Sequence, residues 1–161
     1  MAKWITPIFD RTQTDVDIAI QKITEWITAT ISGYSHDVYD LKGCLNVSDI
    51  NRIEENIGYL AELLNDYGYF PDVSVRTWEN ADIPTENDIK RIVHNVSALV
   101  ESFRQHSDAP TVPSSLTRYD DVNAIEKNLY LMKKLINIME DSFKKSGTFQ
   151  SGSTMFLPIR R

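Results

Sequence analysis

The stretch SDINRIEENIGYL at residues 48–60 recurs twice further along the chain, as NDIKRIVHNVSAL at 87–99 and DDVNAIEKNLYLM at 120–132. The copies align without gaps and begin 39 and 33 residues apart. Such internal repetition indicates one structural unit that is built several times and stacked against itself. The shared polar positions are Asp49, Arg52 and Asn56 in the first copy, Asp88, Arg91 and Asn95 in the second, and Asp121 and Asn128 in the third.

Each copy has the hydrophobic spacing of a helix. In the first copy, apolar residues follow one another in steps of three and four from Ile50 to Tyr67, which places them on one stripe of a helix. The aspartate near the start of each copy fits the first turn, where a carboxylate accepts free backbone N–H groups and meets the positive end of the helix dipole. Thr85 with Asp88 resembles a capping box.

A further stripe upstream of the repeats predicts another helix, which begins at Thr12 or Thr14. We therefore expect an all-α fold, a helical bundle of about four main helices at 14–32, 47–67, 86–106 and 119–145. The expected organisation is a single domain with an N-terminal arm (1–13), the bundle (14–145) and an extended tail (146–161). The upstream stripe consists of Val16, Ala19, Ile20, Ile23, Ile27 and Ile31, with Trp26 at its edge.

The expected connections at 33–46, 68–84 and 107–117 are longer than a tight bundle requires, and long loops often carry partner contacts. Within the second connection, 73–78 reads as an extended stretch with the composition of a short strand. The two terminal arms are rich in apolar residues, so we expect burial either within the chain or between chains. The candidate interaction residues are Trp4, Phe9, Tyr69, Phe70, Trp78, Phe149 and Phe156.

Composition excludes several classes of protein. The chain has 161 residues and a net charge of −6, which argues against a general nucleic-acid binder, because phosphate contacts require clustered Lys and Arg. No segment approaches the roughly 20 apolar residues of a membrane span. The start of the chain lacks the apolar run of a secretory signal, so we expect synthesis in the cytoplasm. The single cysteine, Cys44, rules out an internal disulfide and a cysteine-based metal site.

The sequence shows no catalytic, cofactor-binding or metal-binding motif, and we predict a protein without enzymatic activity and without a cofactor. Two of the three histidines, His94 and His106, lie about 18 Å apart along one predicted helix, too far to share a metal. The asparagine of the repeat borders the buried stripe, where its amide is suited to bond across a helix contact or to a loop carbonyl. Arg52 and Arg91 are placed to reach acidic residues on neighbouring helices.

Two phrases of the chain resemble a known group of proteins. FDRTQTDVD at 9–17 and LKGCLNVSDINRIEENIGYL at 41–60 are similar to small structural proteins encoded with the tail genes of phages and prophages of Clostridia-like bacteria. The run DIPTENDIKRI at 82–92 is also similar, and the resemblance spans roughly residues 4–135. It departs at Lys90 and Val93 in the second copy and at Ala124, which replaces the arginine in the third.

The resemblance implies a structural component of a phage or prophage tail or baseplate, made in the bacterial cytoplasm and found in a virion or tail-like particle. Its partners would be proteins, either further copies of this chain or other tail components. The alternative is a host-surface or carbohydrate-binding adaptor that uses the long loops, which predicts an exposed aromatic cluster at Tyr69, Phe70 and Trp78. A small enzyme would require a cleft with convergent Asp, Glu or His side chains.

Overall fold

The computed structural model describes residues 2–31 and 41–146, and this part contains four helices and no strand. The all-α fold that the sequence predicts is confirmed. The helix bounds agree with the prediction to within one residue except at the end of α3. Residues 33–40 of the first long connection and residues 147–161 of the predicted tail lie outside the described residues. The helices are α1 (Gln13–Ile31), α2 (Val47–Asp66), α3 (Glu86–Ser102) and α4 (Tyr119–Ser146).

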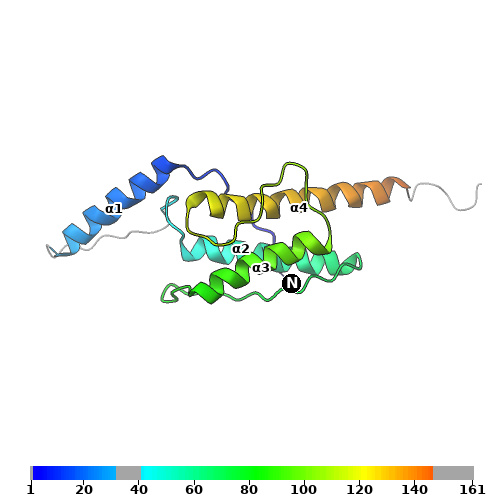
Figure 1. Cartoon of the computed structure of the whole chain (residues 1–161), viewed down its shortest axis with the longest axis horizontal. Coiled ribbons are helices and arrows are strands. Elements are labelled where there is room, and N and C mark those ends of the chain that lie inside the picture. Colours follow the sequence, from blue (N-terminus) through cyan, green and yellow to red (C-terminus); the bar gives the residue numbers. More distant parts are fainter. Residues whose placement is uncertain (1, 32–40, 147–161) are drawn as a thin grey trace, which may run out of the picture.

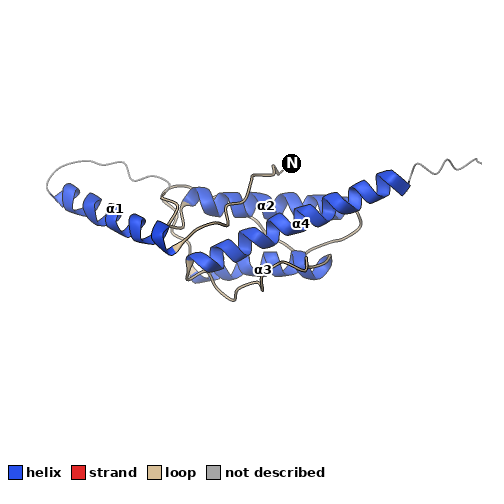
Figure 2. Ribbon diagram, turned by 90° about the horizontal axis from the view of Figure 1, so that it is seen from above, coloured by secondary structure: helices blue, strands red, loops and turns tan. Residues whose placement is uncertain are grey.

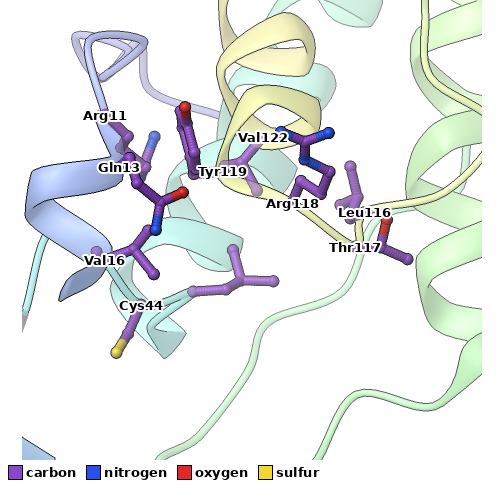
Figure 3. A pocket seen from close by; sticks show the side chains of 11 residues that line it. Arg11, Gln13, Val16, Cys44, Leu116, Thr117, Arg118, Tyr119 and Val122 are labelled. Carbon is purple, nitrogen blue, oxygen red and sulfur yellow. The ribbon is translucent and has the colours of Figure 1, made fainter. Parts of the chain in front are cut away.

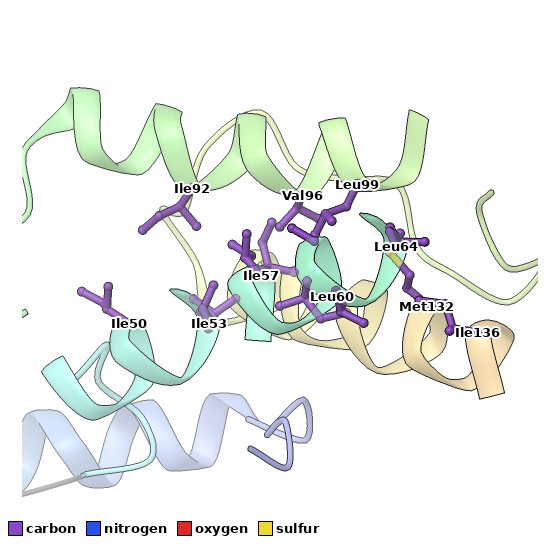
Figure 4. Close-up of a cluster of buried hydrophobic side chains, with 14 of the residues drawn as sticks. Ile50, Ile53, Ile57, Leu60, Leu64, Ile92, Val96, Leu99, Met132 and Ile136 are labelled. Carbon is purple, nitrogen blue, oxygen red and sulfur yellow. The ribbon is translucent and has the colours of Figure 1, made fainter. Parts of the chain in front are cut away.

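The three repeat helices form the bundle. α2, α3 and α4 pack on one another in all three pairwise combinations, and both views show them side by side (Figures 1 and 2). Their apolar stripes meet in one core (Figure 4). Each fully buried Ile or Leu side chain contributes roughly 1.5–3 kcal/mol through burial, so this core fixes the bundle. Its fully buried members include Ile53, Ile57, Leu60, Leu64, Ile92, Val96, Leu99, Ile125, Leu129 and Ile136.

The aspartate of each repeat begins its helix as the sequence predicts. The Asp88 carboxylate accepts the backbone N–H of Thr85 at 2.9 Å, and the Thr85 hydroxyl accepts the N–H of Asp88 at 3.3 Å. α1 begins in the same way, since Thr12 N–H donates to Asp15 at 2.8 Å. The equivalent bonds in the other copies join Asn46 N–H to Asp49 at 3.1 Å and Arg118 N–H to Asp121 at 2.9 Å.

α3 ends at Ser102, so the prediction that it reaches residue 106 is wrong. The Ser102 hydroxyl donates to the carbonyl of Leu99 at 3.0 Å. The backbone of Phe103 leaves the helical region, with φ −119° and ψ −89°. Its ring packs edge-on against Tyr69, with the ring centroids 5.0 Å apart. The contact with the preceding connection therefore ends the helix one turn earlier than its apolar periodicity suggests.

α1 does not pack into the bundle, although its apolar stripe predicts that it does. It projects from one end of the molecule (Figures 1 and 2). Ala19 is buried, but Ile20 and Ile27 are 59% and 47% exposed. The loop before α2 holds the first turn, where a Cβ atom on Gly43 would lie 2.0 Å from the carbonyl oxygen of Asp15. Within the described chain, no helix combines the length and apolar character that a membrane crossing requires.

The capping aspartates predict a dependence of stability on pH. Bonds from the Thr85 hydroxyl and backbone hold the pKa of Asp88 below its usual 3.8. Since the unfolded chain then binds the proton more readily, this contribution is complete above the usual pKa and is lost as the pH falls through the folded value. We expect Asp88→Asn to lower the Tm at neutral pH and to flatten its decline below pH 3.8.

Thermal unfolding followed by circular dichroism from about pH 2 to neutral pH measures both effects. The exposed position Asp72 provides a control, and Asp72→Asn should leave the neutral-pH Tm unchanged. An Asp88→Asn protein with the wild-type Tm at every pH would show that the cap contributes no stability.

Candidate functional site

The asparagine repeated in all three copies bonds to the backbone of an extended segment. Asn56 of α2 accepts the N–H of Ile5 and donates to its carbonyl, both at 2.8 Å. Asn95 of α3 does the same to Ser74, at 3.1 and 2.7 Å. We call such a pair of bonds an asparagine clamp. The clamp satisfies both the N–H and the C=O of one backbone residue, so no neighbouring strand has to do so. This explains why 73–78 is extended but belongs to no sheet.

The third copy has only half of a clamp. Asn128 of α4 donates to the carbonyl of Pro110 at 2.9 Å and to that of Ala124 at 2.8 Å. Its side-chain oxygen is buried and has no hydrogen-bond partner. The reason is chemical, because proline has no N–H to donate. The repeated position thus meets a loop backbone in every copy, and the identity of the loop residue decides whether one bond or two can form.

A second asparagine position makes two further clamps. Asn51 of α2 bonds both backbone groups of Trp78, each at 2.8 Å. Asn123 of α4 bonds Arg11 in the same manner, at 3.2 and 2.8 Å. The equivalent residue of α3 is Lys90, which instead pairs with Glu86 on its own helix at 2.6 Å. Two extended segments are therefore clamped at two points each, and the third segment is not.

Glu54 of α2 is buried and joins two other parts of the chain to its helix. Arg91 of α3 donates to both of its carboxylate oxygens, at 3.0 and 2.5 Å. The indole N–H of Trp78 donates to the same carboxylate at 3.1 Å. Arg91 also donates to the carbonyl of Ser74 at 2.5 Å. This one carboxylate therefore holds α3 and the segment before it against α2.

Glu126 of α4 is 0% exposed and lies in a cluster of four charges that sum to zero. Arg52 of α2 donates to both of its oxygens, at 3.0 and 2.6 Å. Arg11 of the N-terminal arm donates to Glu126 at 3.1 Å and to Asp49 at 2.7 Å. The backbone N–H of Ile8 also donates to Glu126, at 2.5 Å. Removing one partner would leave a buried charge unpaired, which typically costs about 3–5 kcal/mol.

These ion pairs follow a cyclic rule in which the glutamate of one copy meets the arginine of the next. The glutamate of the first copy pairs with the arginine of the second copy, and the glutamate of the third copy pairs with the arginine of the first. The remaining pair would join the second copy to the third, and there the equivalent residues are Val93 and Ala124. Both members are missing together, as expected if a lone charge there would have no partner. The observed pairs are Glu54–Arg91 and Glu126–Arg52.

The electrostatics of both arginines favour the charged form. The bond to Glu54 raises the pKa of Arg91 above its usual value, against the opposing effect of burial. For Arg52, burial lowers the pKa, but the bonds and attraction of Glu126 and Asp49 outweigh it and raise the pKa. These groups hold their protons firmly, which suits permanent ion pairs rather than proton transfer.

The structure also forms a pocket of about 290 Å³ at the base of α1, between its first turn, the loop at 43–45 and the first turn of α4 (Figure 3). Apolar Val16 and Leu116 line it beside the polar Arg118. Cys44 also lines it, and burial, together with the charge of Asp49, raises the pKa of its thiol. The thiolate is the nucleophilic form of cysteine, so this environment disfavours the reactive state.

The aromatic cluster expected of a carbohydrate-binding module does not form. Trp78 is only 3% exposed because it belongs to the core, and its indole N–H is bonded to Glu54. Tyr69 is half-buried against Phe103. Of the three residues, Phe70 is prominent at the surface, at 77% exposure. A single exposed ring does not make a stacking platform for a sugar.

The remaining candidate interaction residues of the arm pack within the chain. Trp4 lies against Tyr59 with ring centroids 5.7 Å apart, and Phe9 lies against Tyr130 at 5.2 Å. Phe149 and Phe156 lie outside the described residues, so the structure does not place them. In the described ranges, no three His, Cys, Asp or Glu side chains come together as metal ligands.

Sequence reasoning missed Arg11, Glu54 and Glu126 as members of the site. A signal was available, because glutamate occupies the same place in the first and third copies, two residues after the position of the repeat arginine. Arg11 carries no such signal, since it lies outside the repeats. Comparisons with protein-family models, curated proteins and solved structures find no match.

The asparagine clamps predict a ranking of stability. We expect Asn56→Ala to lower the free energy of unfolding by about 2 kcal/mol, because two bonds are lost and the Ile5 backbone is left unpaired. Asn128→Ala should cost about 1 kcal/mol, since half of that clamp is absent already. Urea unfolding measures both values. Equal losses in the two variants would contradict the role of Pro110.

The cyclic rule predicts that the missing ion pair can be supplied. Val93→Glu alone should destabilise the protein, because it places an unpaired carboxylate beside the core. Adding Ala124→Arg should recover part of the loss, with a coupling energy of about 1–3 kcal/mol in a double-mutant cycle. Strictly additive effects of the two substitutions would show that these positions do not face each other.

Proposed function

We propose that this chain is a non-enzymatic structural component of a phage or prophage tail or baseplate, and that α1 is the element through which it assembles. The observation that carries the proposal is the apolar stripe of α1. Ile20 and Ile27 lie seven residues apart on one side of the helix, and Trp26 beside them is 38% exposed. Large apolar side chains exposed on a projecting helix favour a protein partner.

The contacts made by the polar residues of the bundle support a structural role for the protein. The buried charged side chains all form ion pairs, and the clamp asparagines bond to the backbone of extended segments. Active sites instead keep titratable groups directed at a cavity, with pKa values matched to proton transfer. Here the arginines and carboxylates fix three helices and two segments as a rigid support for α1.

The resemblance of 9–17, 41–60 and 82–92 to tail-associated structural proteins supports the particular setting. Under the proposal, the partners of α1 are further copies of this chain, other tail proteins, or both. The burial of Trp78 and the half-burial of Tyr69, described above, argue against the alternative of a carbohydrate-binding adaptor. The elongated shape also suits a tail component, since α1 and the end of α4 project in opposite directions (Figure 1).

Disrupting the stripe tests the proposal. We expect the wild-type chain to have a solution mass that is a multiple of 18.5 kDa. Ile20→Glu with Ile27→Glu should reduce that mass to one chain, because charges on the stripe oppose apolar association. Light scattering coupled to size-exclusion chromatography measures the mass, and circular dichroism verifies that the helices remain.

The matched control places the same charges on another face of the helix, away from Ile20 and Ile27. Thr14→Glu with Gln21→Glu changes two exposed positions of α1 that also lie seven residues apart, and should keep the wild-type mass. A wild-type protein that is a single chain at every concentration would contradict self-association through α1. So would an assembly that both double variants leave intact.

A further inference from the structure

We propose that the N-terminal arm, residues 2–11, exchanges between copies, so that the arm of one chain binds the bundle of a second copy of this chain. The inference rests on the proposed function, since assembly brings the copies together. The surface concerned consists of the α2 and α4 residues that bond the arm, which we call the arm seat. These residues are Asn56, Glu55 and Glu62 of α2 and Asn123 and Glu126 of α4.

The arm is recognised mainly through its backbone. Its N–H groups donate to the arm seat at five residues along its length, from Ala2 at 3.2 Å and Lys3 at 2.8 Å through to Arg11 at 3.2 Å. Two of those residues, Ile5 and Arg11, are held in complete asparagine clamps. Every one of these contacts can be made to an arm that comes from another copy, because none requires the arm and the seat to be in one chain.

Charge complementarity favours this particular occupant. The arm seat is acidic, with carboxylates at Glu55, Glu62 and Glu126. The arm carries Lys3 and Arg11, and its one acid, Asp10, pairs with Lys42 at 3.1 Å, outside the seat. The guanidinium of Arg11 enters the buried cluster and bonds Glu126 at 3.1 Å. An extended peptide without a cation at that place would leave the buried charges unbalanced. The second copy of this chain supplies the arginine at the correct distance from Ile5.

The connection between the arm and its seat sets the arm apart from the other extended segments. Ile5 and its clamp residue are 51 positions apart, whereas Ser74 and Pro110 lie 21 and 18 positions from theirs. The additional chain contains the whole of α1. A short connection confines a segment to its own bundle. The longer connection of the arm allows a neighbour to compete for the seat once the contact between Gly43 and the first turn of α1 opens.

α1 links the two proposed events in space. It begins at Gln13, directly after the arm, and projects away from the bundle with its apolar stripe exposed (Figure 2). Copies that associate along α1 with the helices parallel would therefore hold each other's arms close to both arm seats. Since the bonds are identical within and between chains, local concentration decides which arrangement prevails.

A disulfide can report where the arm lies. A Cβ atom built on Gly58 of α2 lies 3.5 Å from the Cβ of Ala2, which is within the range of disulfides. Full-length Ala2→Cys and Gly58→Cys chains, each also carrying Cys44→Ser, are purified separately, mixed at high concentration and oxidised. We expect a disulfide-linked heterodimer of twice 18.5 kDa on a non-reducing gel. A mixture of Asn80→Cys with Gly58→Cys, which places the thiol on an exposed loop, gives the background.

Three outcomes decide the inference. A heterodimer yield several-fold above the background supports exchange. A yield at the background level, while a single chain with both Ala2→Cys and Gly58→Cys closes its own disulfide, overturns exchange and leaves the arm within its own chain. Failure of both disulfides overturns the arm seat itself. The solution mass of the wild-type chain tests the proposed function separately. If the chain assembles but no disulfide forms between chains, arm exchange is refuted and the proposed assembly is not.

Discussion

An extended segment packed against helices must find partners for its backbone N–H and C=O groups, and this constraint organises the whole structure. The asparagine amide meets it with one donor and one acceptor, spaced to match a single backbone residue. The same position of α2 and α3 performs this task, with both bonds at 2.7–3.1 Å. The half-clamp of α4 follows from the same rule, since Pro110 offers a carbonyl but no N–H.

The repeated unit is accordingly an extended segment followed by a helix, rather than a helix alone. Arginine and glutamate then join each unit to the next, through Glu54–Arg91 and Glu126–Arg52. In the first unit, α1 is inserted between the segment and the helix, and this insertion is the part that projects from the bundle (Figure 1). The bundle thereby provides rigidity, while the insertion and the arm provide the surfaces that we propose for assembly.

Local features were predictable from the sequence, and features that depend on distant contacts were not. The starts of the helices follow from capping pairs such as Thr85 with Asp88, and their apolar stripes identify the core. Three of the four helix ends were also predicted, but the end of α3 depends on Phe103 meeting Tyr69 from another segment. The stripe of α1 resembles a core stripe, and no local signal distinguishes burial in a bundle from exposure on a projecting helix. The sequence suggested a bond from the repeated asparagine to a loop, but which residue it clamps depends on how the segments fold back.

Two buried asparagines, Asn56 and Asn95, hold backbone amides as firmly as a helix does. Amide hydrogen exchange followed by NMR tests it directly. We expect the N–H groups of Ile5 and Ser74, although they lie outside any helix, to exchange as slowly as those of core residues such as Leu60. Exchange of both amides at the rate of an unstructured peptide would contradict it.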